Sequence, residues 1–281
     1  MNEYILIVEN LTKIYDKFQL KNVSFKLKRG QIMGFIGPNG AGKSTTIKSI
    51  MGIIPFDSGN ILIDGKDFQK NEIEIKKVIG YVGEHLDFYE HVKLKKIYRF
   101  IRAFYKDWNE DLFRNLINRF GLDLEKKMKE LSKGMVVKFS LALALAHFPK
   151  LLILDEPTSG LDPIVRNDIL DILKEYAKNN CSILFSSHIT EDIIKIADEV
   201  TYINNGEIKL IENKKVILNY YFKVNISAIN RLKNCKVIFK NENEAIIYVD
   251  SYTLKQLDLL PEKESFTKIS LDELLNFIVK L

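Results

Sequence analysis

The chain has 281 residues, enough for one large domain or for a large domain with a small one, and 46% of them are hydrophobic and 28% charged. The formal net charge of +5 comes from lysines spread along the chain, which fits a solvated surface and does not separate nucleic-acid binding from a basic face beside a membrane. Cys181 and Cys235 form no disulfide or metal-ligand pattern, and the first residues show no signal peptide, so we expect a reducing cytosol. The longest apolar stretch, residues 139–148, is far shorter than the ~20 residues that span a bilayer, so no membrane span is expected.

Strands dominate the prediction for the first part of the chain. A helix is predicted from about residue 43 to residue 51, directly after a glycine-rich turn. Apolar or alternating runs predict strands at 4–11, 18–27, 31–37, 59–65 and 77–83.

Residues 86–150 are predicted to be mainly helical. The run at 92–105 mixes basic and aromatic residues, which is compatible with a nucleic-acid interface. An amphipathic helix that packs its aromatic face into a core explains the same spacing, and we expect this second interpretation. The residues predicted to share the core face are Leu94, Ile97, Tyr98, Ile101 and Phe104.

Buried strands return in the second half of the chain. Two apolar runs predict strands at 151–155 and 182–187, a helix is predicted over 165–180 between them, and residues 200–208 read as a hairpin.

The sequence pattern changes after about residue 215. A capping box from Ser270 to Glu273 then opens a final helix. We therefore expect a small α+β accessory domain at 216–281, whose sequence shows no site chemistry. Three runs in it alternate like strands, at 222–227, 236–240 and 245–250.

Residues 37–45, GPNGAGKST, fit the pattern G-x-x-x-x-G-K-[ST] in full. The motif follows an apolar strand and opens a helix, as a phosphate-binding loop must, which makes an incidental glycine-rich turn the weaker interpretation. The glycines let the backbone wrap phosphates, Lys43 can reach the β- and γ-phosphates, and the Ser44 hydroxyl can ligate Mg²⁺. The predicted nucleoside triphosphate site is formed by Gly37, Pro38, Asn39, Gly40, Ala41, Gly42, Lys43, Ser44 and Thr45.

Three more polar residues follow buried strands. Asp155 ends an apolar strand at the carboxyl edge of the sheet, where it can hold hydrated Mg²⁺ beside the phosphate loop. Glu156 comes next and can polarise the attacking water as a general base. His188 ends another apolar strand, so it can stabilise the γ-phosphate or orient Glu156, although a lone histidine is more often structural.

Together these motifs resemble the ATP-binding subunit of an ABC transporter over about residues 3–215. Residues 37–45 resemble the Walker A loop, and residues 151–157 resemble the Walker B strand with its catalytic glutamate. His188 resembles the switch histidine, Tyr15 the aromatic residue that stacks on adenine, and SGLD, which ends at Asp162, the D-loop.

LSKGM, residues 131–135, occupies the place of the ABC signature, which usually reads LSGGQ. Ser132 and Gly134, which matter most for phosphate contact, are present, whereas Lys133 and Met135 replace glycine and glutamine. A helix N-terminus favours an anion, and the resemblance implies that this anion is the γ-phosphate of ATP held by another subunit. Lys133 adds a positive charge there, which either strengthens the closure of the two subunits on ATP or lies at the rim of the site without effect.

Glu84 is a second departure from the family pattern, because it stands where the Q-loop usually has glutamine. A glutamate can still ligate Mg²⁺ or a water molecule, and it adds negative charge beside the nucleotide. The variant signature and the short C-terminal extension resemble the ATPase subunits of bacterial exporters whose membrane protein is a separate chain, such as bacitracin- and lantibiotic-resistance exporters.

The resemblance implies an α/β fold of the P-loop NTPase type. The ATP-binding domain is expected at 1–215, with a mainly parallel core sheet, an N-terminal antiparallel β subdomain and a helical subdomain at about 86–150. The expected cofactors are ATP and Mg²⁺, and the expected partners are a second ATP-binding subunit, identical or different, and a separate transmembrane permease subunit. The chain would then work at the cytoplasmic face of the cell membrane and hydrolyse ATP to drive transport.

Two other functions are compatible with the same motifs. A soluble ABC ATPase of repair or translation would act on nucleic acid, but the repair type carries a long coiled coil and the translation type two ATPase halves, which this sequence lacks. No nucleic-acid partner is therefore expected. A weakly hydrolysing regulatory module is the second alternative, suggested by Glu84 and the altered signature.

Overall fold

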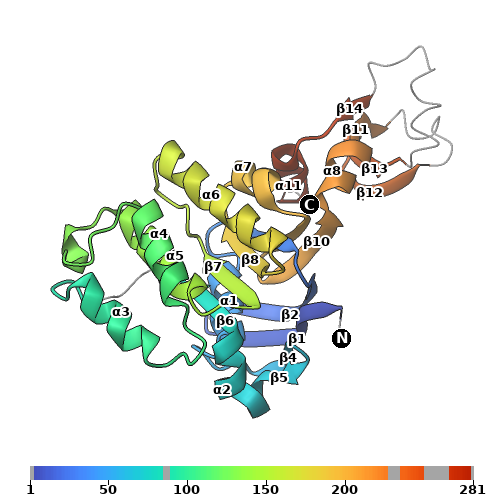
Figure 1. The fold of residues 1–281 in the computed structure, drawn as a ribbon. Helices are drawn as coiled ribbons and strands as arrows, with labels where there is room; N and C mark the ends of the chain where they lie inside the picture. Colours follow the sequence, from blue (N-terminus) through green and yellow to red (C-terminus); the bar gives the residue numbers. More distant parts are fainter. Residues whose placement is uncertain (1–2, 85–88, 227–234, 250–265, 280–281) are drawn as a thin grey trace.

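The computed structural model describes residues 3–84, 89–226, 235–249 and 266–279. Within these ranges the chain forms one six-stranded sheet and two four-stranded sheets, with helices packed around the central sheet (Figure 1). No helix in the described part of the chain is both long and apolar enough to span a bilayer. Some predicted segments lie outside the described residues, namely 86–88 of the helical subdomain and 227–234, 250–265 and 280–281 of the accessory domain.

The central sheet is parallel except at one edge. Its strands pair in parallel from β6 to β9, and only β10 runs antiparallel to its neighbour. The central strands are buried throughout and mainly apolar, as parallel strands covered on both faces usually are. The carboxyl ends of β3, β7 and β8 therefore meet at one edge. In spatial order the strands are β10 (Glu207–Asn213), β9 (Glu199–Asn204), β3 (Ile32–Ile36), β8 (Ser182–Ser187), β7 (Leu151–Asp155) and β6 (Ile79–Val82).

The two faces of the central sheet belong to two hydrophobic clusters. Phe35 and Leu184 pack in the same cluster as Ile47 and the N-terminal sheet. Leu154 and Phe185 belong to the other cluster, with the helices that follow the signature and the D-loop. The helices of the central unit are α1 (Lys43–Ile50), α6 (Pro163–Lys178) and α7 (Thr190–Ile196).

The N-terminal strands form an antiparallel sheet, as predicted. Its spatial order is β2-β1-β4-β5. Helix α2 follows this sheet and was not predicted, because only Phe68 and Ile75 are buried along it and its backbone leaves helical geometry at Asn71. The elements are β1 (Tyr4–Tyr15), β2 (Phe18–Lys28), β4 (Ser58–Ile63), β5 (Lys66–Asp67) and α2 (Phe68–Val78).

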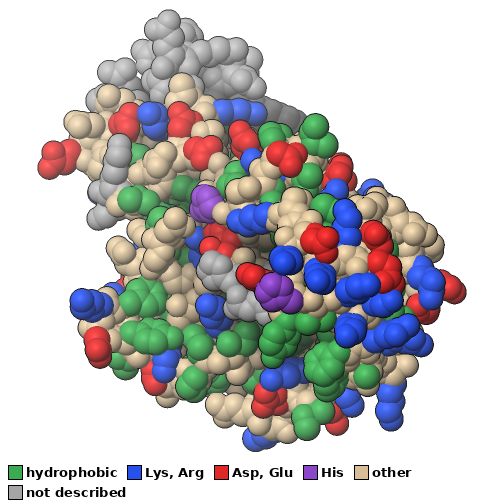
Figure 2. Space-filling view, turned by 90° about the vertical axis from the view of Figure 1, so that its left-hand side faces the viewer, with side chains coloured by type: hydrophobic (Ala, Val, Ile, Leu, Met, Phe, Trp, Pro, Cys, Tyr) green, Lys and Arg blue, Asp and Glu red, His purple; other side chains and the backbone are tan. Residues whose placement is uncertain are grey.

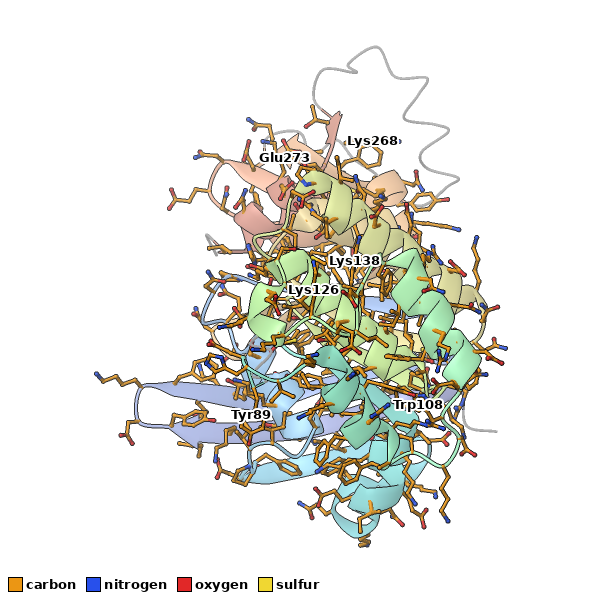
Figure 3. All side chains as sticks on the ribbon, turned by 60° about the vertical axis from the view of Figure 1, so that its left-hand side comes forward. Tyr89, Trp108, Lys126, Lys138, Lys268 and Glu273 are labelled. Atoms are coloured by element: carbon orange, nitrogen blue, oxygen red, sulfur yellow. The ribbon has the colours of Figure 1, made fainter. Side chains whose placement is uncertain are left out.

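The helical subdomain lies on one side of the central sheet (Figure 1). Tyr98 stacks on Phe113 with ring centroids 4.4 Å apart, and Trp108 packs against both rings from the connection between α3 and α4 (Figure 3). The predicted core face is correct for Leu94, Ile97 and Tyr98, which are buried. The described elements are α3 (Leu94–Arg102), α4 (Glu110–Arg119), the 3₁₀ helix η1 (Met128–Glu130) and α5 (Lys133–Leu145).

The prediction that Phe104 lies on the core face of this helix is wrong. Its side chain is 65% exposed. Helix α3 ends at Arg102, so the periodicity that placed Phe104 on the core face no longer applies to it.

The C-terminal elements form a third sheet with the order β12-β13-β11-β14. The predicted capping box is present, because Ser270 Oγ accepts from Glu273 N at 3.2 Å and Ser270 N donates to Glu273 Oε2 at 2.9 Å. The predicted division near residue 215 stays a prediction, and it falls inside α8. The elements are α8 (Lys214–Tyr220), β11 (Tyr221–Asn225), β12 (Lys236–Lys240), β13 (Glu244–Tyr248), β14 (Phe266–Lys268) and α11 (Leu271–Val279).

Helix α11 packs on α7, and apolar side chains of both helices belong to one cluster (Figure 1). Ile193 and Ile196 of α7 share this cluster with Leu271 and Leu274 of α11. A hydrogen bond from Thr190 Oγ1 to an Asp272 carboxylate oxygen, 2.6 Å long, joins the same two helices.

Candidate functional site

The phosphate loop connects β3 to α1. Gly42 caps α1 with a φ of 112°, in the region that favours glycine, and a Cβ atom there would lie 2.6 Å from Leu20 Cδ2. A Cβ on Gly37 would lie 2.3 Å from the carbonyl oxygen of Ile203. Both glycines are therefore required for the loop to pack, and the loop leaves the N-terminus of α1 open toward a ligand.

Lys43 is buried at the start of α1 with its ammonium group turned back over the loop. Its Nζ donates to the carbonyl oxygens of Gly37 at 2.7 Å and Pro38 at 3.2 Å. The same Nζ lies 3.1 Å from Glu156 Oε1, an ion-pair contact without hydrogen-bond geometry. The lysine that was predicted to bind phosphate is thus held at the site by a carboxylate and two carbonyls.

Asp155 lies at the end of β7, fully buried and beside Ser44. Its Oδ1 accepts hydrogen bonds from Ser186 Oγ at 2.8 Å and Ser44 Oγ at 3.1 Å, while Oδ2 has no hydrogen-bond partner among the described residues. Burial raises the pKa of Asp155, the two hydroxyl groups partly oppose this, and the negative charges of Glu84 and Glu156 raise the pKa further. The carboxylate therefore offers one unpartnered oxygen and gains from a nearby cation.

The Glu156 carboxylate contacts both Lys43 and His188. Its backbone has a φ of 50°, which is uncommon for a residue with a side chain. The carboxylate Oε2 lies 2.7 Å from His188 Nδ1 and Oε1 faces Lys43. The structure thus brings together Lys43, Ser44, Asp155, Glu156 and His188, although they come from three separate strand ends.

A cavity of about 560 Å³ opens over this network. Glu84 lines it too, and its place beside the nucleotide stays a prediction. Tyr15 is not among the lining residues; it is 44% exposed, and Lys13 Nζ lies 5.4 Å above its ring. The lining residues are Lys17, Phe18, Asn39, Gly40, Gly42, Lys43, Ser44, Thr45, Glu84 and Glu156.

Three residues at or beside the cavity were missed by the sequence analysis. Lys17 and Phe18 lie at the hairpin between β1 and β2, where Phe18 pairs with Tyr15, and their proximity to Tyr15 was the only signal. Ser186 contacts Asp155 and Glu156, but a serine within an apolar strand carries no motif.

Ser132, Gly134 and Asp162 form a second surface, away from the cavity lining. Ser132 caps α5 and accepts from Met135 N at 3.3 Å, and Asp162 caps α6 and accepts from the amides of two following residues. A Cβ on Gly134 would lie 2.7 Å from Val165 Cγ1, so the two helix starts pack closely. The signature and the D-loop therefore share one surface, which does not reach the nucleotide cavity of the same chain.

Comparisons with known proteins agree with this geometry. The family model described as "ABC transporter" matches residues 20–159. The ABC transporter ATP-binding protein YtrB of Bacillus subtilis is 33% identical over 222 residues, which cover 78% of this chain and 76% of that protein. The bacitracin transport ATP-binding protein BcrA of Bacillus licheniformis is 36% identical over 74% of this chain and 69% of its own length.

A solved structure of an ATP-binding subunit of an ABC transporter covers 76% of this chain and 91% of its own chain, with a TM-score of 0.69 and 30% identity. The predicted fold class and the predicted resemblance are both confirmed. The chain therefore belongs to the ABC transporter family, of which it is an ATP-binding and ATP-hydrolysing subunit.

Proposed function

We propose that this subunit powers an exporter by closing head to tail with a second ATP-binding subunit over ATP and Mg²⁺, while attached to a separate membrane permease. The observation that carries the proposal is the contact of Lys43, Glu156 and His188 above the phosphate loop, beside Asp155 and Ser44. Export is inferred from the resemblance to exporters whose membrane protein is a separate chain.

ATP binding would replace the internal partners of Lys43. The ammonium group now contacts Glu156 and the loop carbonyls. A γ-phosphate carries more charge than one carboxylate and can accept from both Lys43 and the amides at the start of α1. Lys43 would therefore move to the phosphates, and Glu156 would lose its cation and become free to act as a base.

The residues around Asp155 fit Mg²⁺. The unpartnered Asp155 Oδ2 and the nearby Ser44 hydroxyl are oxygen donors, which this ion prefers, and Glu84 adds a third oxygen donor along the cavity. When bound, Mg²⁺ would neutralise part of the charge on the β- and γ-phosphates. Asp155, which burial makes costly to ionise, would gain a positive neighbour.

Hydrolysis would use Glu156 as the base that takes a proton from water. His188 holds Glu156 Oε2 through Nδ1 and so fixes the direction of the carboxylate.

The second subunit would complete the site with its signature. The N-terminus of α5, with Ser132 and Gly134, presents free backbone amides that favour an anion, and it does not line its own cavity. Its phosphate would come from ATP in the other subunit. Asp162, on the same surface, would then lie at the interface between the subunits.

The permease would dock in an apolar groove of about 430 Å³ between β6, α3 and α5. Phe100 and Phe104 at its edge are 67% and 65% exposed, and hydrophobic side chains gather on the lower half of this side of the molecule (Figure 2). Gly83 lines the groove and Glu84 lines the nucleotide cavity, so one short segment touches both. A cytosolic segment of the permease would thereby sense nucleotide binding, and the subunit would reside at the cytoplasmic face of the membrane.

The decisive experiment is the Glu156→Gln variant, because it removes the proposed base and keeps the side-chain volume. We expect normal ATP affinity, turnover at least a hundredfold below the parent and accumulation of a closed dimer in gel filtration. Asp171→Asn, an exposed change on α6, is the control and should leave all three unchanged. Undiminished turnover of Glu156→Gln would rule out its role as the base.

A further inference from the structure

Ser186 lies between the two carboxylates of the proposed site. Its hydroxyl donates to Asp155 Oδ1 at 2.8 Å and accepts from the backbone N–H of Glu156 at 2.9 Å. The side chain is completely buried. A serine hydroxyl has one proton to donate, so Ser186 directs it to Asp155 and offers its lone pair to Glu156.

The sheet register explains how one residue reaches both carboxylates. Strands β7 and β8 are parallel neighbours, and Asp155 pairs with Ser186 in the ladder. Paired residues of adjacent strands project from the same face, so the Ser186 hydroxyl stands beside the last residue of β7. The chain leaves the strand immediately after this point, at Glu156.

The backbone of Glu156 needs support at this turn. Its φ of 50° lies in the left-handed region, which residues with side chains adopt only when their surroundings hold them there. The hydrogen bond from Glu156 N to Ser186 Oγ is such a restraint. The same turn directs the Glu156 carboxylate to Lys43 and His188.

We propose that Ser186 is a positioning residue for ATP hydrolysis, which fixes the orientation of the metal-binding Asp155 and the backbone turn of the hydrolytic Glu156 at the same time. This inference rests on the proposed roles of these two carboxylates. Ser186 is completely buried and does not line the nucleotide cavity, so it would act only through its neighbours.

The adjacent Ser187 provides a matched comparison. It is equally buried, but its hydroxyl accepts from Ile189 N at 2.9 Å within its own turn and contacts neither carboxylate. If the loss of any buried serine hydroxyl lowered turnover, substitutions at Ser186 and at Ser187 would both do so. A positioning role predicts lower turnover only for the substitution at Ser186.

The first test compares Ser186→Ala with Ser187→Ala in a steady-state ATPase assay. We expect Ser186→Ala to lower kcat about tenfold, the usual effect of losing a hydrogen bond to a charged group, while KM for ATP changes less than about threefold. Ser187→Ala should retain kcat within about twofold of the parent. A Ser186→Ala variant with parental kcat would overturn the inference.

The second test measures binding without hydrolysis. In a Glu156→Gln background, calorimetry with ATP in the presence of Mg²⁺ and in the presence of a chelator separates the metal contribution from that of the nucleotide. Ser186→Ala should weaken binding about twofold with Mg²⁺ and leave binding in chelator unchanged. An equal loss in both conditions would mean general damage to the site and would overturn the positioning role.

Two further measures keep the outcomes distinct. If Ser186→Ala does not fold, Ser186→Cys, close in shape but a weaker donor, should give the same split between kcat and KM, and parental kcat in that variant would overturn the inference. Normal turnover in Glu156→Gln would remove the proposed role of Glu156 as the base, on which the inference rests. An inactive Glu156→Gln with an unaffected Ser186 variant would remove only the inference about Ser186.

Discussion

The ion pair between Lys43 and Glu156 is the central contact of the candidate site, and its strength can be measured. Both side chains are almost completely buried, and their charged atoms lie 3.1 Å apart. At this distance two unit charges attract each other by about 5 kcal/mol at an effective dielectric constant of ~20. Desolvation of both groups opposes the attraction, so we expect a net coupling energy of about 2 kcal/mol.

A double-mutant cycle of Lys43→Met and Glu156→Gln measures this coupling. The free energies of unfolding come from urea titrations without nucleotide. Each single substitution leaves one buried charge unpaired and should destabilise the protein by about 3 kcal/mol, and the double variant should lose about 2 kcal/mol less than the sum of the two. Glutamine keeps an acceptor for His188, so the cycle isolates the charge.

The exposed pair Arg119–Glu175 is the control, with its atoms only 2.8 Å apart and both side chains about half exposed. Its coupling energy should stay below about 0.5 kcal/mol, because solvent screens exposed pairs. A coupling for Lys43 and Glu156 as small as that of the control would refute the reasoning, since burial would then not strengthen the pair.

Three other predictions concern the signature, a buried histidine and the groove. Ser132→Arg should keep the ATP affinity and abolish ATP-driven dimerisation in gel filtration, because the N-terminus of α5 could no longer receive a phosphate; a normal dimer would exclude the trans site. Burial lowers the pKa of His147 from 6.5 to about 4, so the unfolded chain binds this proton more readily than the folded chain. Between pH 6.5 and 4, this group should therefore lower the free energy of unfolding by about 1.4 kcal/mol for each unit by which the pH falls. Urea titrations of His147→Gln should lack that part of the slope, whereas the exposed His91→Gln should retain it. Phe104→Asp should reduce co-purification with the permease at least tenfold, whereas Ile73→Asp, a change on α2 at a still more exposed apolar residue, should not. Equal retention of the permease by both variants would rule out the docking groove.

The phosphate loop and the two carboxylates could be predicted because their signals are local. In the loop, the glycines, Lys43 and Ser44 lie within nine consecutive residues that follow an apolar strand, and Asp155 and Glu156 stand at the end of the apolar run at 151–155. The carboxyl edge of a parallel sheet then places them together without knowledge of the side-chain packing. The roles given to these residues remain predictions, while their proximity is a property of the structure.

The contacts of Ser186 and Phe18 could not be predicted, since they depend on structure that no short pattern encodes. The register between β7 and β8 decides that Ser186 faces Asp155, and a shift by one residue would turn its hydroxyl to the other face. Phe18 reaches the cavity through the path of a hairpin. Phe104 was assigned to the core because periodicity does not reveal where a helix ends.

The shared cluster of α7 and α11 changes where a truncation of the chain can be made. A chain cut at residue 215, where the sequence pattern changes, would keep Ile193 and Ile196 and lose the apolar residues of α11 that belong to the same cluster. Exposed apolar surface of this kind promotes self-association. A shortened form of this subunit would therefore need polar substitutions on α7 to avoid self-association through this surface, even though no residue after 215 lines its nucleotide cavity.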